Sequence, residues 1–287
     1  MLRTSALLVL LLLCSRVNGA GERWYVMLMD EHRAGWMVER ERVEDGRVIS
    51  ESETRMTLRR DITELTITIQ TRFEETEQGE PIEMWARTAF GGAPSEELTV
   101  FGDEITWTQT QNGVSQTKTM PQPEGRWLAP AAASRYVAQR LEAGAERIVV
   151  RVVEPATGVE PVTTTRSGFE QTTIEVMGRS VDALRCTTVS SVYPDVASVE
   201  YIDGKGRLLR SEISIGVWEM TILAADEQLA MSPLDPPELM RSMFVKPDRE
   251  IKRPYQAHRS SFLVSATDGV MPDLPFAGSQ FVERVDE

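Results

Sequence analysis

The sequence predicts a mainly β protein: a curved antiparallel meander, resembling half of a barrel, with one covering helix and a short C-terminal β segment. The first observation is strict alternation, clearest at Leu65, Ile67, Ile69 and Phe73, whose neighbours are polar. The second is the short turn signals between such runs, of which Asn112-Gly113 is the strongest. The third is that a clear helical pattern begins only at Pro130. Together these features favour consecutive hairpins over any alternating β/α architecture.

The stretch from Ala197 to Leu223 shows this texture most fully. Val199 and Tyr201 lead into the turn 203–206, and the return run places Leu209, Ser211, Ile213 and Ile215 on one face. After Gly216 a third run alternates in the same way, through Trp218, Met220 and Ile222. We therefore expect three antiparallel strands here, each with one buried and one solvated face.

The remaining expected strands follow the chain in order, and with these three they give a strand content far above the usual one. The run 48–58 is mostly polar, so it is predicted to lie at an edge or over a solvated face. The other expected strands are 24–29, 35–42, 64–74, 82–90, 98–101, 105–110, 114–119, 147–153, 162–167, 171–177 and 181–192.

The expected helix starts at Pro130, because proline is tolerated in the first turn. Tyr136, Val137 and Leu141 form a narrow apolar stripe, and Gly144 is a suitable C-terminal stop. One helix of this kind can cover part of the apolar face of a long meander.

The N-terminus has the features of an export signal: Arg3, an apolar run from Ala6 to Leu13, and small residues around 17–19. A lipoprotein signal ending at Cys14 is the alternative, but Leu13 fits poorly in the preceding position. We expect cleavage before Ala20 and a periplasmic or cell-envelope location, with no transmembrane helix in the mature form.

Four segments are predicted: a signal peptide over 1–19, an antiparallel β domain over 20–231, a proline-rich linker over 232–254, and a C-terminal segment over 255–287. The last segment is too short to bury its own core. It either packs on the main domain or opens a second, incomplete domain.

Charge and composition exclude several function classes. The formal charge of the chain is −13, and it falls to −15 without the signal, which holds two arginines and no acids. So acidic a chain is repelled by phosphate backbones, so nucleic acid is not an expected partner. No phosphate loop or dinucleotide fingerprint occurs in the sequence, and no cofactor is expected.

Catalytic and metal-binding residues are not predicted either. The two histidines, His32 and His258, have no partner at ligand spacing and are expected to be surface or hydrogen-bonded residues. Cys186, the one thiol left after removal of the signal, lies within an expected strand. Nucleophilic thiols favour helix N-termini or exposed electropositive sites, so Cys186 is expected to be a core residue.

The six tryptophans are the more informative inventory, although sheet packing accounts for most such residues. A cluster of them on the concave face of a curved sheet would make an apolar or carbohydrate-binding groove. The candidate ligand-binding residues are Trp36, Trp85, Trp107 and Trp218.

Two sets of residues carry a family resemblance. The order Ile174–Gly178, Ala183–Arg185, Tyr201–Asp203 and Arg207–Arg210 resembles the β-rich exported domains related to lipoprotein-carrier proteins, in which a curved sheet wraps around helix. The chain as a whole is similar to the N-terminal region of bacterial exported transglutaminase-like proteins of the planctomycete type. The residues that carry this second resemblance are Trp24–Met27, Gly35–Met37, Leu223–Asp226, Leu234–Leu239, Met271–Pro275 and Ala277–Gln280.

The resemblance implies a non-catalytic exported binding or accessory domain of a transglutaminase-like protein, acting on an unknown protein or an apolar ligand. That family needs a Cys nucleophile at a helix start with a later His and Asp, and this sequence contains no such motif, so no catalytic residue is transferred. One alternative is a periplasmic carrier of lipid or another apolar ligand. Another is an enzyme that uses dispersed carboxylates, for example on glycans.

Overall fold

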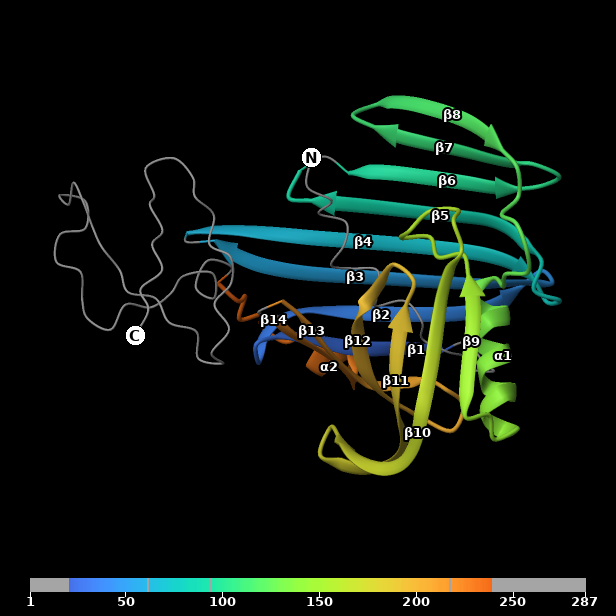
Figure 1. The fold of residues 1–287 in the computed structure, drawn as a ribbon. Coiled ribbons are helices and arrows are strands. Elements are labelled where there is room, and N and C mark those ends of the chain that lie inside the picture. Colours follow the sequence, from blue (N-terminus) through green and yellow to red (C-terminus); the bar gives the residue numbers. More distant parts are fainter. Residues whose placement is uncertain (1–20, 61, 93, 217, 239–287) are drawn as a thin grey trace, which may run out of the picture. The chain divides into compact units, whose positions relative to one another are not determined.

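The strands of this protein follow one another as hairpins in a single antiparallel sheet. A computed structural model describes residues 21–60, 62–92, 94–216 and 218–238. These residues form a fourteen-stranded sheet, helix α1 (Pro130–Glu142) and short helix α2 (Glu227–Ala230) (Figure 1). The predicted fold class, a curved antiparallel meander with one covering helix, is confirmed, whereas the predicted C-terminal β segment lies outside the described residues. The strands are β1 Gly21–Met29, β2 His32–Glu44, β3 Arg47–Arg60, β4 Thr63–Thr76, β5 Pro81–Phe90, β6 Ser95–Phe101, β7 Ile105–Gln111, β8 Val114–Met120, β9 Arg147–Val152, β10 Val162–Val176, β11 Arg179–Ser190, β12 Tyr193–Ile202, β13 Leu208–Ile215 and β14 Trp218–Ala225.

The sheet consists of two meanders joined at its centre. The first wing runs from β1 to β8 and the second from β9 to β14, with neighbours in sequence paired throughout each wing. The wings join where β1 pairs with β14, with Trp24 opposite Ala225 and Met29 opposite Met220. Helix α1 follows β8 in the chain and precedes β9, so the connection that contains it links the two edges of the sheet.

Turn chemistry explains the tight hairpins. Asn112 and Gly113 both have positive φ, 52° and 75°, which suits the two-residue turn expected from the sequence. Between β12 and β13 the Asp203 carboxylate accepts hydrogen bonds from the backbone N–H groups of Lys205 and Arg207 at 2.9 Å. The three strands expected from 197 to 223 are present as β12, β13 and β14. A register shift at Tyr201/Ile202 buries Leu208, whereas the sequence placed Leu209 on the buried face.

The main core lies on the inner face of the sheet, where the two wings meet. In β4, Ile67 and Ile69 are buried while Thr68 between them is half-buried, as the alternation predicts. Methionines are frequent among the first-wing contributors. The buried cluster contains Tyr25, Met27, Met29, Ala34, Met37, Met56, Leu58, Ile67 and Ile69 from the first wing, and Cys186, Ile202, Leu208, Ile213, Met220 and Ile222 from the second.

Strand β3 is not at an edge, which corrects one of the two positions offered for its polar run. It pairs with β2 from Arg47 to Met56 and with β4 from Arg47 to Arg60. Its small polar residues face inward, where the Ser52 and Thr71 hydroxyls lie 2.7 Å apart and hydrogen-bond across the strands. The serine and threonine residues of β3 therefore belong to a polar part of the interior, because buried hydroxyls that pair with each other are tolerated in a sheet.

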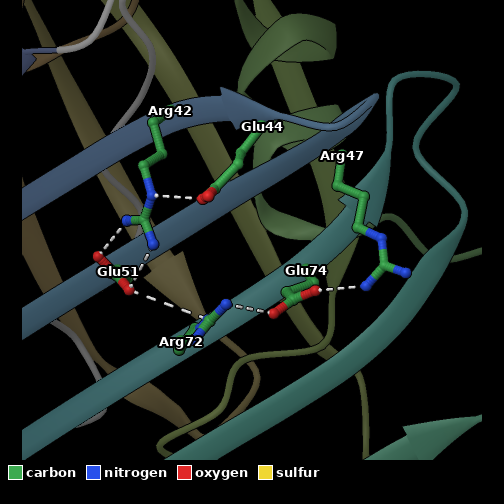
Figure 2. Close-up of polar contacts among 6 residues, drawn as sticks. All are labelled: Arg42, Glu44, Arg47, Glu51, Arg72 and Glu74. Atoms are coloured by element: carbon green, nitrogen blue, oxygen red, sulfur yellow. Dashed lines mark hydrogen bonds and ion pairs between the residues drawn. The ribbon is translucent and has the colours of Figure 1, made fainter.

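The outer face of β2, β3 and β4 carries alternating charges in place of a second core. Glu51 binds Arg42 and approaches Arg72, whose Nε lies 3.9 Å from it, and Arg72 also binds Glu74. Opposite charges lie side by side across neighbouring strands, so this face can contact solvent while its charged side chains remain paired. The six members of this charge ladder are Arg42, Glu44, Arg47, Glu51, Arg72 and Glu74 (Figure 2).

Helix α1 spans the residues expected, from Pro130 to Glu142, and Gly144 ends it with positive φ. It packs on β9 and contacts β3, so it lies on the inner side of the sheet (Figure 1). The start of the predicted linker also packs on the domain: Asp235 donates its N–H to the Arg33 carbonyl, and Arg59 donates its N–H to the Pro237 carbonyl. The predicted segment boundaries at 19 and 254 lie outside the described residues.

Candidate ligand-binding cleft

A cleft lies between α1 and the inner face of the sheet. Its walls come from both wings and from the segment that follows β9. Its volume of about 80 Å³ is below the roughly 300–1,000 Å³ of pockets that enclose drug-sized ligands. As it stands, the cleft fits a small molecule or the end of a larger one. The lining residues are Arg23, Glu39, Arg40, Glu41, Ser50, Glu51, Ser52, Thr71, Phe73, Pro130, Ala133, Ser134, Val137, Val150, Val152, Glu154, Pro155 and Arg166.

One wall of the cleft is apolar. Ala133 and Val137 of α1 pack with Val150 and Val152 of β9 in a second buried cluster. Phe73 lines the cleft from β4. This wall can contact the hydrocarbon part of a ligand.

A buried carboxylate fixes the helix that makes this wall. Glu75 accepts a hydrogen bond from the Ala131 N–H at 2.9 Å, and its other oxygen binds the Arg135 guanidinium at 3.1 Å. A carboxylate at a helix N-terminus satisfies an N–H that has no partner within the helix. Burial nevertheless raises the pKa of Glu75 to about 7, against these hydrogen bonds and the Arg135 charge. A side chain at Gly79 would approach Ala132 within 2.7 Å, so glycine lets the β4–β5 turn approach the helix closely.

The opposite side of the cleft is polar. Arg23 on β1 and Glu39 on β2 lie opposite each other in register and form an ion pair of 3.0 Å. The Tyr25 hydroxyl donates to the same carboxylate at 3.3 Å. The inner face of the first wing is therefore polar beneath α1 and becomes apolar beyond Tyr25, at Met27.

The second wing contributes a buried ion pair. The Arg166 guanidinium on β10 lies 2.8 Å from the Glu200 carboxylate on β12, and both side chains are almost completely buried. Pairing of this kind is what allows two charges to stay in an interior of low dielectric constant.

Glu154 differs from the other acids of the cleft. It follows β9, lines the cleft and is only 3% exposed. Its Oε2 atom is fully buried and has no hydrogen-bond partner among the described residues. Burial alone raises the pKa of its carboxyl to about 8, so the group is protonated at neutral pH.

The sequence contained a signal for Glu154 that the strand prediction did not use. Ile148, Val150 and Val152 alternate on the buried face of β9, and the same parity places Glu154 on that face. A charged residue in phase with a buried apolar run is the pattern that marks an interior acid.

The four predicted tryptophans lie on different faces, and none of them lines the cleft. Register places Trp36 and Trp85 on the face of the charge ladder, since Trp85 lies opposite Arg72. Trp36 stacks on Trp24, with ring centroids 5.6 Å apart. Trp107 is opposite Thr99 on the inner face and has the Lys118 ammonium over its ring, while Trp218 packs against the main core. Their proposed role in ligand binding stays a prediction.

Cys186 and His32 are placed as expected. Cys186 lies within β11, has no exposed surface, and its pKa is raised to about 12 by burial and by the nearby Glu200 charge. A thiol of this kind is inert. His32 is exposed and its Nδ1 lies 2.7 Å from the Asp235 carboxylate, whereas His258 is outside the described residues. Over the described part of the chain, no group of three metal-ligating side chains is found.

Comparisons with known proteins give a fold and no family. No family model matches the chain, and no curated protein matches it. A crystal structure of a β-barrel-like protein from Brucella abortus, a domain of unknown function named DUF1849, matches with a TM-score of 0.52 and 13% identity. The match covers 72% of this chain and 96% of that one, and it shows a shared fold.

A second structure, the lipoprotein LppX of Mycobacterium tuberculosis, matches at 11% identity over 72% of this chain and 86% of that one. Its TM-score is 0.22, and at that value the two backbones differ too much for a functional comparison. The resemblance to transglutaminase-like proteins finds no counterpart in these comparisons and stays a prediction. Within the described residues, no helix is long and apolar enough to cross a membrane.

Proposed function

We propose that this chain is a non-catalytic binding domain of the cell envelope, which holds a small amphiphilic ligand in the cleft beneath α1. The observation that carries the proposal concerns Glu154, which lines the cleft and has a buried carboxyl oxygen without a hydrogen-bond partner among the described residues. Six buried side-chain atoms of the described residues have no hydrogen-bond partner, and Glu154 Oε2 is the one whose residue lines the cleft. A ligand group is one way to satisfy such an atom. The envelope location rests on the export signal expected over 1–19.

Two further features support binding of an amphiphile over a wholly apolar ligand. The apolar wall from α1 and β9 faces a side that carries the Arg23–Glu39 pair and the Ser52–Thr71 hydroxyls. A lipid chain would remove water from the part of the Arg23–Glu39 pair that is still exposed, and desolvation of charged groups is unfavourable. A ligand with one short apolar part and one polar end satisfies both sides.

The neutral fluorescent probe N-phenyl-1-naphthylamine tests the proposal, because its phenyl end can enter the cleft and its fluorescence rises in an apolar site. Ser134 lines the cleft and is half-buried, so Ser134→Trp should obstruct it. Gln139→Trp places the same ring on an exposed position of the same helix and is the matched control. We expect saturable binding to the parent and to Gln139→Trp, weakened at least tenfold in Ser134→Trp. Equal binding by all three proteins, or none by the parent, would refute the proposal.

A hydrolase that uses dispersed carboxylates is the second candidate, because a protonated acid in a cleft is what a general acid requires. A glycoside hydrolase also needs a second carboxylate at a set distance, and Glu39 in the same cleft is already bound by Arg23 and Tyr25. Release of reducing ends from a panel of polysaccharides, abolished by Glu154→Gln, would favour this candidate. Turnover unchanged by Glu154→Gln, or none at all, would exclude a catalytic Glu154.

A further inference from the structure

Four acids in and around the cleft follow one rule: each has a cationic partner. Glu39 pairs with Arg23, Glu200 with Arg166, and Glu51 with Arg42. Glu75, at the start of α1, pairs with Arg135. The cations that line the cleft are matched in turn, since Arg40 pairs with Glu22.

Glu154 is the exception to this rule. No guanidinium or ammonium of the described residues forms an ion pair with it, and its Oε2 accepts no hydrogen bond. Its backbone carbonyl accepts hydrogen bonds from the N–H and the hydroxyl of Thr157, which leaves the side chain unused. Glu154 therefore contributes to the cleft a buried carboxyl group that no cation of the described residues neutralises.

We propose that the cleft takes a small organic cation, an amine or amidine on a short apolar body, whose charged group pairs with the Glu154 carboxylate. This inference rests on the proposed function and adds the chemical class of the ligand. Val137, Val150 and Val152 supply the apolar wall for the body of such a molecule. The net charge of −13 also attracts cations and repels anions at long range.

Binding of a cation is linked to loss of the Glu154 proton. The carboxyl is neutral without ligand because burial raises its pKa to about 8, and it must ionise to form an ion pair. An alkylammonium ion stays protonated over this range, as a lysine side chain does. The affinity for such a cation should therefore rise about tenfold per pH unit between pH 6 and 7, and level off above pH 8. The other charged groups that line the cleft are Arg23, Glu39, Arg40, Glu41, Glu51 and Arg166.

Two five-atom probes of the same shape, n-butylammonium and 1-butanol, test the charge requirement. The full chain, labelled with nitrogen-15, is titrated with each probe, and amide shifts of Val150 and Val152 report millimolar binding. At pH 8 we expect the Kd of n-butylammonium to be at least tenfold lower than that of 1-butanol, and the difference to shrink at pH 6.

Glu154→Gln keeps the shape of the side chain and removes its charge, so it should abolish the preference for the cation and its pH dependence. Glu160→Gln makes the same charge change at an exposed position of the same connection and should leave both intact. A preference that survives in Glu154→Gln, or equal affinities for the two probes in the parent, would overturn the inference.

The same experiment separates this inference from the proposed function. If N-phenyl-1-naphthylamine binds and Ser134→Trp obstructs it, while n-butylammonium shows no advantage over 1-butanol, the cleft binds ligands but does not select cations. If none of the three probes binds to the cleft, the binding function itself is wrong, and the inference fails with it.

Discussion

The charge ladder on the outer face and the cleft on the inner face both contain glutamates, and the comparison shows how the surroundings decide what a carboxylate does. In the ladder, Glu51 and Glu74 each have arginine partners on neighbouring strands, as Figure 2 shows. In the cleft, Glu154 is buried as deeply as the valines beside it and has no such partner. The ladder thus satisfies its own charges, whereas Glu154 leaves an interaction to be made by something else.

The two regions also differ in what they contribute to stability. Exposed ion pairs are screened by solvent and salt and contribute little, with most values between 0 and about 1 kcal/mol. A buried acid without a partner is unfavourable whenever it is ionised. Binding sites often lower the stability of the folded protein, because a group left unpaired in the fold is the group available to a ligand.

The sharpest way to test this difference is to turn a paired acid into an unpaired one. Arg166→Met removes the cation from the buried pair and leaves Glu200 buried without its arginine partner, a situation comparable to that of Glu154. We expect a loss of about 3–5 kcal/mol of unfolding free energy at pH 7, measured by urea denaturation, because an uncompensated charge remains buried.

The double variant Arg166→Met/Glu200→Met provides the control. It removes both charges at similar volume, so it should recover most of the lost stability. If the single and double variants are equally destabilised, packing rather than charge explains the effect, and the comparison with Glu154 does not hold.

The next largest effect concerns the pH dependence of stability. The pKa of Glu154 is about 8 in the folded protein and about 4.5 when unperturbed, so between these values the native state binds more protons than the unfolded state. Stability from this group therefore falls as the pH rises, by about 3 kcal/mol between pH 5 and 8. Glu154→Gln should remove the contribution of this carboxyl, so the unfolding free energy should fall less over the same pH range.

Glu75 gives the internal reference for that measurement. Its pKa of about 7 is also raised, so it adds a decline of the same sign that ends near pH 7 and persists in Glu154→Gln. An unchanged pH profile in Glu154→Gln would mean that Glu154 is not buried unpaired in solution.

The smallest effect is expected in the charge ladder. Glu51→Gln breaks the links to Arg42 and Arg72, yet the side chain is 27% exposed, so the loss should be no more than about 1 kcal/mol. The loss should shrink further in 0.5 M salt, because screening weakens the pairs in the parent. Glu44→Gln, at the exposed end of the ladder, should be close to neutral. A loss above about 2 kcal/mol in Glu51→Gln would show that the ladder is a buried network.

Most of the fold could be predicted from the sequence because its contacts are local. Alternation over 64–74 and the Asn112-Gly113 turn report the strand and the hairpin directly. The pairing of β1 with β14 could not be predicted, because the local sequence around Trp24 or Ala225 does not indicate which distant strand it pairs with. The same limitation allowed an edge position for β3, because polar residues that pair with each other inside a sheet have the composition of an edge strand.

The cleft was less accessible to sequence reasoning than the fold. The tryptophans were selected for size, but register distributes them over both faces, and their proximity to a ligand depends on curvature that alternation does not encode. Glu154 could have been found from its parity with Val150 and Val152. The absence of an ion-pair partner could not be predicted, because alternation within one strand does not show which arginines of other strands reach a side chain.

The single seam between β1 and β14 has a consequence for how the chain folds. Every other pairing in the sheet joins strands adjacent in sequence. Each wing can therefore form from its own hairpins, with little entropic cost of loop closure. The seam joins residues about two hundred positions apart and cannot form until both wings exist. Folding should therefore proceed as two fast local events followed by one slow docking step, and until that step is complete both strands of the seam present open edges to other chains.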